Sequence, residues 1–289
     1  MTVLPADFIK KIEQQFPDQA SAIITALDDA SYTSVRLNPS KSNSNPFDNI
    51  SPISWADNAF FLAERPSFTF DPLFHAGAYY VQEASSMFIA EIFKQHVDTN
   101  NALKVLDLCA APGGKACHLL ERQPDLKELV ACDASANRLQ RVVDNTERLG
   151  LTSTVIKADA RTLPSEIVSP GFDAILADVP CSATGVMRRN PDVKLLRRTV
   201  DISQFAEQKL AILQGLWPAL KPGGRLLYVT CSILEAENDA VIKAFAQQHK
   251  VQIMSIVMER GISRDVGWQV MPEVDGGDGL YFSLLSKPA

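Results

Sequence analysis

The chain has 289 residues, of which 46% are hydrophobic and 21% are charged, and its net charge is -6 at neutral pH. This composition is ordinary for a globular protein, and no apolar run approaches the roughly 20 residues that cross a bilayer, which excludes a membrane-spanning protein. The acidic balance argues against nucleic-acid binding over the whole surface, because phosphates are contacted by Lys and Arg. Any nucleic-acid surface must therefore be local.

The N-terminal residues have no apolar stretch of the kind found in signal peptides and mix acids with lysines, so we expect a cytoplasmic protein. The cysteines are odd in number and lack the C-x-x-C spacing of a zinc site. We therefore expect reduced thiols and no bound metal. The five cysteines are Cys109, Cys117, Cys132, Cys181 and Cys231.

Residues 1–75 are predicted to form a small α+β domain. Apolar residues at helical spacing predict a helix over 6–28, which Pro17 should divide in two, because proline ends or kinks a helix. A short strand is expected at 34–38. Residues 39–53 are rich in Ser, Asn and Pro without periodicity, which indicates a loop. An aromatic stretch at 68–80 is interpreted mainly as packing between this domain and the sheet that follows, with stacking on a nucleic-acid base as the alternative.

Residues 76–289 are predicted to form the catalytic domain. From residue 103 onward, apolar runs alternate with helical patterns, which is typical of an α/β fold with a doubly wound, mostly parallel sheet. One such helical pattern ends at Gly150, where a C-terminal cap belongs. Four of the runs end in an acid or a cysteine, and open α/β sheets bind ligands at the carboxyl ends of their strands. The runs are 103–109, 128–133, 153–159, 172–178, 225–231 and 279–286.

The first run passes directly into a glycine-containing turn. Glycine lets the backbone approach a ligand closely, although a turn can also need glycine for its conformation alone. Asp133 stands twenty positions after Gly113 and ends the second run, where a carboxylate can accept both hydroxyls of a ribose. The turn lacks the G-x-G-x-x-G pattern of dinucleotide sites, which favours an adenosyl cofactor without phosphates. Its residues are Cys109, Ala110, Ala111, Pro112, Gly113, Gly114 and Lys115.

Two of the cysteines follow strands and are candidates for nucleophilic chemistry. Cys181 follows the fourth run and Cys231 ends the fifth, and if these strands are adjacent both thiols can face one pocket. Free cysteine is commonly buried and inert, and we favour that interpretation for the other three thiols. A thiolate suits one reaction in particular, because carbon 5 of cytosine becomes nucleophilic once a thiolate has added to carbon 6.

The segments LDLCAAPGGK, ADVPCSATG and YVTCS together resemble the Sun/Fmu-type family of RNA (cytosine-5) methyltransferases, especially its bacterial 16S ribosomal RNA branch. The resemblance covers about residues 75–289, while the N-terminal part matches more loosely, at 36–38 and 80–86. It implies a Rossmann-like fold that uses S-adenosylmethionine, which the 109–115 turn would hold. Asp133 would bind its ribose and Asp159 would face its adenine, with Arg138 a lesser candidate beside the cofactor.

The same resemblance implies how the two thiols divide the chemistry. Cys231 would attack carbon 6 of the cytosine and Cys181 would assist release of the product. Asp178 would hydrogen-bond the cytosine or lie against the methyl donor. Cytosine-5 DNA methyltransferases attack with a cysteine of the Pro-Cys type instead, so the presence of both thiols points to RNA. The segment around Cys181 reads DVPC where DPPC is commoner, a minor departure.

RNA contact is predicted for the densest basic segment, with a solvated helix face as the alternative. The target cytosine must be single-stranded or flipped, because a paired base cannot present carbon 6 to a thiol. We expect the chain to differ from many bacterial ribosomal members in having no helical RNA-binding domain before residue 1. RNA affinity would then rest on residues 1–75, on the basic segment and on a partly assembled small ribosomal subunit as substrate. The basic residues are Arg188, Arg189, Lys194, Arg197 and Arg198.

Three other functions are compatible with parts of this pattern. One is cytosine-5 methylation of tRNA or another RNA. A second is methylation of a small molecule or a protein on the same fold, against which the two thiols argue, since nitrogen and oxygen methylation require no covalent thiol. The third is a non-catalytic, RNA-binding ribosome assembly factor that keeps the fold. We expect a monomer in each case.

Overall fold

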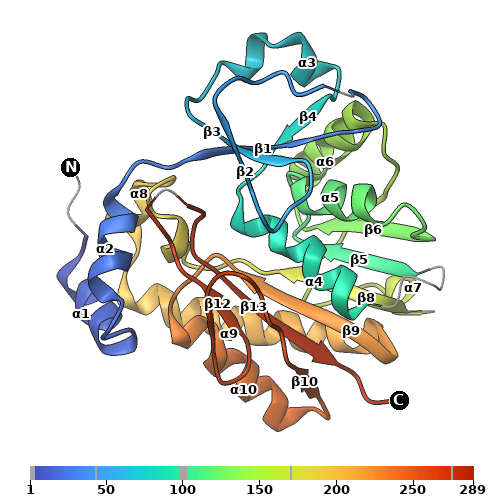
Figure 1. The fold of residues 1–289 in the computed structure, drawn as a ribbon. Helices are drawn as coiled ribbons and strands as arrows, with labels where there is room; N and C mark the ends of the chain where they lie inside the picture. The colour runs from blue at the N-terminus through green and yellow to red at the C-terminus, as the bar shows by residue number, and fades with distance from the viewer. Residues whose placement is uncertain (1–3, 43, 98–102, 170, 275) are drawn as a thin grey trace.

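The computed structural model describes residues 4–42, 44–97, 103–169, 171–274 and 276–289. Two sheets organise the described chain (Figure 1). A four-stranded antiparallel sheet has the order β2-β3-β1-β4, and a nine-stranded sheet has the order β11-β12-β13-β9-β8-β5-β6-β7, with β10 paired to β13. None of the described helices is long and apolar enough to span a bilayer.

The large sheet has a parallel centre and an antiparallel edge. Its parallel strands are β5 (Lys104–Leu108), β6 (Glu128–Asp133), β7 (Thr154–Lys157), β8 (Phe172–Asp178) and β9 (Leu220–Thr230). Its antiparallel strands are β10 (Gln252–Met254), β11 (Ile262–Ser263), β12 (Trp268–Val270) and β13 (Leu280–Ser286). The predicted α/β class with a mostly parallel sheet is confirmed, and each of the six apolar runs contains a strand.

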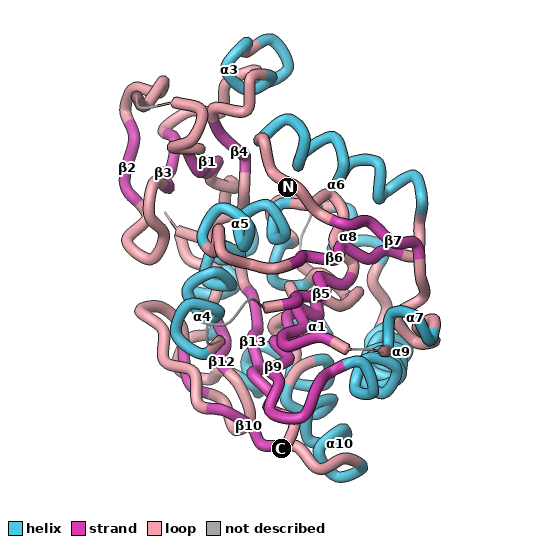
Figure 2. Tube along the Cα trace, turned by 90° about the vertical axis from the view of Figure 1, so that its right-hand side faces the viewer, coloured by secondary structure: helices cyan, strands magenta, loops and turns pink. Residues whose placement is uncertain are grey.

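Helices cover both faces of the large sheet, and Figure 2 shows α4 and α5 on one side and α7 and α9 on the other. Successive side chains of a strand point to opposite faces, so neighbours in one strand enter different cores. Val105 packs in the core under α4, α5 and α6, whereas Leu106 packs in the core under α7, α9 and α10. The six helices are α4 (Phe88–His96), α5 (Gly114–Arg122), α6 (Ala136–Leu149), α7 (Ser165–Val168), α9 (Thr199–Leu216) and α10 (Asp239–Gln248).

The N-terminal helices are divided at Pro17, as predicted, into α1 (Ala6–Gln15) and α2 (Ala20–Asp28). They pack against α8 (Asp192–Leu196) and the start of α9 rather than on the small sheet, because their apolar residues share a core with Val193 and Ile202. The N-terminal region therefore contacts the large domain in two places, through these helices and through the small sheet.

The small sheet consists of β1 (Thr33–Leu37), β2 (Ile50–Pro52), β3 (Ala59–Leu62) and β4 (Tyr79–Val81). The prediction of a loop over 39–53 was wrong at its end, where β2 pairs with β3. The division at residue 75 stays a prediction. β4 lies after it and pairs with β1 of the small sheet, so β4 and residues 82–83, which follow it directly, are counted with the small domain. Between β3 and β4 the chain forms a 3-10 turn, Phe68–Phe70, and the short helix α3 (Pro72–His75).

The aromatic stretch at 68–80 has two roles in packing. Phe68, Phe74 and Tyr79 pack together inside the small domain. Tyr80 packs instead with Cys117 and Leu149 of the large domain. Tyr80 therefore packs the small domain against α5 and α6, which cover the large sheet, while three other rings build the core of the small domain itself. Phe70, the fifth ring of the stretch, is exposed.

Candidate active site

The candidate site lies where the carboxyl ends of the parallel strands meet the small domain. β8 and β9 are adjacent, as predicted, with Asp178 paired in register with Val229. A cavity of about 300 Å³ opens at this edge of the sheet. The 109–115 turn, Asp178 and Cys231 line one side, and residues 80–83 of the small domain line the other. Both domains are therefore needed to form the cavity.

The glycine turn brings bare backbone to this cavity. Gly113 has φ 105°, a left-handed conformation that favours glycine, and α5 begins at the next residue. A Cβ added to Gly114, which lines the cavity, would lie 2.9 Å from the ring of Tyr80. Glycine is thus required at these two positions for different reasons, one conformational and one steric.

Two buried carboxylates near this turn lack hydrogen-bond donors. Asp133 accepts from the backbone N–H of Ser135 at 3.0 Å through Oδ1, but its Oδ2 has no hydrogen-bond partner, although the Arg138 guanidinium is 3.3 Å away. Asp107, in the middle of β5, is fully buried and neither of its oxygens has a partner. Buried acceptors without donors are costly, so these groups fit a ligand that brings hydroxyl or amine donors.

Asp107 was not among the predicted site residues, although it lines the cavity. Burial raises its pKa to about 8, and the positive charge of Lys115 opposes this effect. The signal in the sequence was an acid inside an otherwise apolar run, LKVLDL. Such an acid has to be either paired or functional, because an unpaired charge in a core is expensive.

Asp159 lies apart from these two acids. Its carboxylate forms an ion pair of 2.6 Å with Arg161, and this hydrogen bonding lowers the pKa of Asp159 to about 2. It does not line the cavity, and its side chain is 39% exposed. A contact with an adenine therefore stays a prediction, and it would require Asp159 to share its oxygens with Arg161.

Lys115 and Asp178 form an ion pair of 2.7 Å inside the cavity. Burial opposes the positive charge of Lys115, but the carboxylate of Asp178 outweighs it, and the pKa of Lys115 is raised. This ion pair therefore lines the same cavity as Cys231.

The two predicted thiols are in contact, with Cys181 Sγ 3.1 Å from Cys231 Sγ. Cys231 lines the cavity, whereas Cys181 is not among its lining residues. The hydrogen bond between the sulfurs lowers the pKa of Cys181 and raises the pKa of Cys231, so the pair can lose one proton much more easily than two. A thiolate on either sulfur is stabilised by the remaining S–H.

The basic segment is divided by the structure. Arg188 has a fully buried side chain that binds Asp278 at 2.5 Å, and Lys194 is buried against Asp28 at 2.7 Å. These two cations already have protein partners and almost no exposed surface, so the other three are better placed to contact RNA. Arg197 and Arg198 are exposed. Arg189 also binds Asp278 but lines the cavity.

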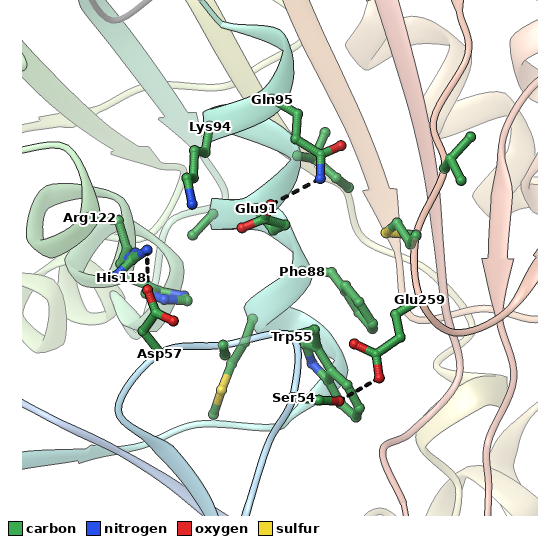
Figure 3. A pocket seen from close by; sticks show the side chains of 16 residues that line it. Ser54, Trp55, Asp57, Phe88, Glu91, Lys94, Gln95, His118, Arg122 and Glu259 are labelled. Carbon is green, nitrogen blue, oxygen red and sulfur yellow. Dashed lines mark hydrogen bonds and ion pairs between the residues drawn. The ribbon is translucent and has the colours of Figure 1, made fainter.

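A second cavity, of about 290 Å³, lies at the junction of the small domain with α4, α5 and residues 257–259 (Figure 3). Its polar side chains pair with one another across the junction: Asp57 with Arg122 at 2.6 Å and Ser54 with Glu259 at 2.5 Å. Since these contacts join the small domain to the large one, we interpret this cavity as part of the seam between the domains.

The large sheet, its covering helices and the cavity at the carboxyl ends of its strands have the arrangement of a Rossmann-like methyltransferase fold. The chain belongs to the RsmB/F family, because residues 94–286 match the family described as 16S rRNA methyltransferase RsmB/F. Residues 4–84 match the N-terminal domain of 16S rRNA methyltransferase RsmF. The resemblance expected from the three sequence segments is confirmed.

Relatives include ribosomal RNA small subunit methyltransferase B of Shewanella oneidensis, 44% identical over 80% of this chain and 53% of its own length. The probable methyltransferase B of Coxiella burnetii is 40% identical over 98% of this chain and 68% of its own length. The chain thus spans about half of the length of the first relative and about two thirds of the second.

Solved structures share the fold. A methyltransferase homolog protein from Pyrococcus horikoshii is 25% identical with a TM-score of 0.80, and covers 97% of this chain and 94% of that one. NSun6 from the same organism, crystallised with SFG, an S-adenosylmethionine analogue, has a TM-score of 0.84 at 18% identity. It covers 100% of this chain and 99% of that one.

Proposed function

We propose that this protein transfers a methyl group from S-adenosylmethionine to carbon 5 of a cytosine in 16S ribosomal RNA, with Cys231 as the covalent nucleophile. The observation that carries the proposal is the pair of thiols in contact at 3.1 Å, of which Cys231 lines the cavity beside Asp178 and the glycine turn. Methylation of nitrogen or oxygen needs neither thiol, so the pair favours carbon chemistry.

The cofactor would be held by the 109–115 turn, by Asp133 and by Asp107. The unpartnered Oδ2 of Asp133 fits a ribose hydroxyl, and the unpartnered oxygens of Asp107 fit another donor such as an amine. S-adenosylmethionine supplies an electrophilic methyl group when it is bound. Its recognition by Asp159 and Arg138 remains part of the proposal.

The residues of this chain would act on the cytosine in two stages. Cys231 Sγ loses its proton to solvent and bonds to carbon 6, the electron pair of the ring double bond moves to carbon 5, and carbon 5 takes the methyl group. The proton on carbon 5 then leaves to a base, the S–C6 bond breaks, the double bond re-forms and Cys231 leaves as a thiolate. Cys181, 3.1 Å away, stabilises that thiolate by donating its S–H.

The proposed substrate follows from the relatives, whose names describe methylation of small-subunit ribosomal RNA. The protein would then work in the cytoplasm, on RNA or on a partly assembled subunit. Exposed Arg197 and Arg198, with Arg189 at the cavity, would contact phosphates near the flipped cytosine.

The mechanism is tested with labelled S-adenosylmethionine, ribosomal RNA from cells lacking the protein, and denaturing electrophoresis. We expect Cys231→Ala to abolish both methyl transfer and any covalent protein–RNA species. Cys181→Ala should still attack and methylate, then stall, so that a covalent complex accumulates. The double variant should show no complex.

The opposite pattern, with a complex in Cys231→Ala and none in Cys181→Ala, would reverse the roles of the thiols. Methylation intact in both single variants, without any complex, would refute covalent catalysis. Nucleoside analysis of the product separates carbon 5 of cytosine from other positions, and transfer to tRNA alone would replace ribosomal RNA as the substrate. No transfer to any RNA would favour an assembly factor.

A further inference from the structure

The serines that follow the two thiols are bound by one buried glutamate. Ser182 follows Cys181 and Ser232 follows Cys231. Glu237 Oε1 accepts a hydrogen bond from Ser182 Oγ and another, of 2.8 Å, from Ser232 Oγ. Glu237 Oε2 accepts from the backbone N–H of Ser182 at 2.9 Å. The carboxylate therefore joins the two turns that present the thiols.

The charge of Glu237 is balanced inside the protein by Lys209 of α9. The Lys209 Nζ lies 2.5 Å from Glu237 Oε2, and both side chains are 0% exposed. A buried ion pair contributes little net stability, because both charges lose their hydration, whereas removing one partner leaves a charge without compensation. A contribution to stability therefore explains this ion pair poorly. A role in holding the two turns that carry the thiols explains it better.

Other contacts hold the same two turns in register. The backbone N–H of Gly185 donates to the carbonyl of Cys231 at 2.9 Å, and Thr184 Oγ1 lies 3.1 Å from Ser232 Oγ. Asn238 Nδ2 donates to the carbonyl of Ser232 at 2.9 Å. These bonds surround the Glu237 carboxylate, which remains the only charged group in contact with both serines among the described residues.

We propose that Glu237, paired with Lys209, is a positioning residue that sets the distance between the two thiol sulfurs. By holding the serines after both cysteines on one carboxylate, it keeps the sulfurs close enough to share a proton. The effect of this spacing on catalysis rests on the proposed function. In that mechanism the S–H of Cys181 stabilises Cys231 while the bond from Cys231 to carbon 6 of the cytosine forms and breaks. The spacing itself requires neither RNA nor cofactor.

The spacing is tested by disulfide trapping in the whole chain, without RNA or S-adenosylmethionine. Diamide takes two electrons and two protons from a pair of thiols and is reduced to the hydrazine, so a disulfide forms fastest where thiols already meet. Peptide mass spectrometry reports the link between the two active-site thiols. We expect Glu237→Gln to slow its formation by on the order of tenfold, since a neutral amide cannot accept from all these donors and the turns separate.

Glu121→Gln is the matched control. It breaks another buried ion pair, with Arg36 at 2.7 Å, whose side chains are only 2% and 10% exposed. Its trapping rate should equal that of the wild type. If Glu237→Gln fails to fold, as judged by circular dichroism, the double variant Ser182→Ala, Ser232→Ala removes the hydroxyl donors and keeps the ion pair. We expect it to slow trapping in the same direction.

A wild-type trapping rate in folded Glu237→Gln, or in the serine double variant, would overturn the proposal. Methyl transfer to RNA adds a second readout, in which kcat should fall by on the order of tenfold while KM for S-adenosylmethionine stays unchanged, because Glu237 does not line the cofactor cavity. A fall in kcat together with a rise in KM for S-adenosylmethionine would mean that the substitution disturbs the whole site, and would contradict a role confined to the spacing of the thiols. If the wild type methylates no cytosine, the proposed function fails, and trapping still decides what Glu237 does.

Discussion

Asp107 places a carboxyl group in the interior of β5, with no hydrogen-bond donor for either oxygen. Burial raises its pKa to about 8, so near neutral pH the folded protein holds a proton that the unfolded chain releases near pH 4. Between these two pH values the folded state binds more protons than the unfolded state. The free energy of unfolding must therefore fall as the pH rises through this range.

Asp107→Asn removes this titration without changing the shape of the side chain. We expect the stability of the variant relative to the wild type to rise by on the order of 3 kcal/mol between pH 5.5 and pH 8.5. All other titrating groups are common to both proteins and cancel in the difference. Chemical denaturation at the two pH values measures the difference in the free energy of unfolding between the variant and the wild type. If this difference is the same at both pH values, Asp107 is ionised in the folded protein as well as in the unfolded chain.

Asp133 offers a second test of a single carboxylate. Asp133→Ala removes the oxygen that lacks a hydrogen-bond donor, together with its ion pair to Arg138 and the bond to the Ser135 backbone N–H. A hydrogen bond to a charged group contributes about 1.5–3 kcal/mol, so the affinity for S-adenosylmethionine should fall by about tenfold to a hundredfold. Calorimetry measures the affinity, and circular dichroism checks the fold. Unchanged affinity would mean that another group binds the ribose.

Site residues could be predicted from the sequence where their position depends on nearby residues in the chain. Asp133 and both thiols could be placed at strand ends, because strand ends are visible in the pattern of apolar runs. Arg188 could not be recognised as a structural residue, since its partner Asp278 lies 90 positions further along the chain. Clustering of cations in sequence carries no information about such distant partners.

At the scale of elements, a strand could be predicted where its own residues carry the signal, and was missed where its position depends on distant partners. The central strands are apolar along their length because helices cover both faces, and this signal survives without any knowledge of pairing. β2 and β10 have three residues each and β11 has two, which is too short for an alternating pattern to develop. Their positions depend on neighbouring strands rather than on their own sequence.

The start of α5 gives a prediction at this scale. A Cβ at Gly114 would lie 2.9 Å from the Cε1 atom of Tyr80, a buried ring in β4. We expect Gly114→Ala to cost about 1–3 kcal/mol of stability and to weaken cofactor binding, because either the ring or the glycine turn must move at the cavity. Thermal unfolding and calorimetry measure the two effects.

A double-mutant cycle shows whether the clash is the cause. Replacing Tyr80 with Leu in the Gly114→Ala background should restore part of the stability that the alanine removes, since the ring that it meets is gone. Strictly additive effects of the two changes would mean that the alanine acts in another way, for example through the backbone of α5.

At the scale of the whole molecule, residues from both domains line the candidate active-site cavity. The large sheet supplies the thiols and acids, and residues 80–83 of the small domain supply the opposite wall. The second cavity and its ion pair between Asp57 and Arg122 lie along the same junction (Figure 3). The sequence did not predict this arrangement, because it depends on how the two sheets pack against each other.

The distribution of charge over the whole chain limits which residues can attract RNA. The net charge is -6, so attraction of RNA has to come from local cations, and the structure leaves Arg197 and Arg198 exposed near the candidate site. Arg197 also donates to the carbonyl of Ser182 at 3.0 Å, whereas no such bond is found for the Arg198 side chain with the described residues outside its own helix cap. Arg198 is therefore the cleaner site for a charge substitution.

Arg198→Gln should reduce the slope of log affinity against log salt by about one unit, because one fewer phosphate contact releases one fewer counterion. Lys243→Gln is the control, since Lys243 of α10 is also exposed but pairs with Asp265 and does not line the cavity, and its slope should match the wild type. Fluorescence anisotropy with a labelled single-stranded RNA, titrated at several salt concentrations, measures both. Equal slopes for all three proteins would assign Arg198 to a solvated surface and leave RNA attraction to other cations, beginning with Arg189 at the cavity.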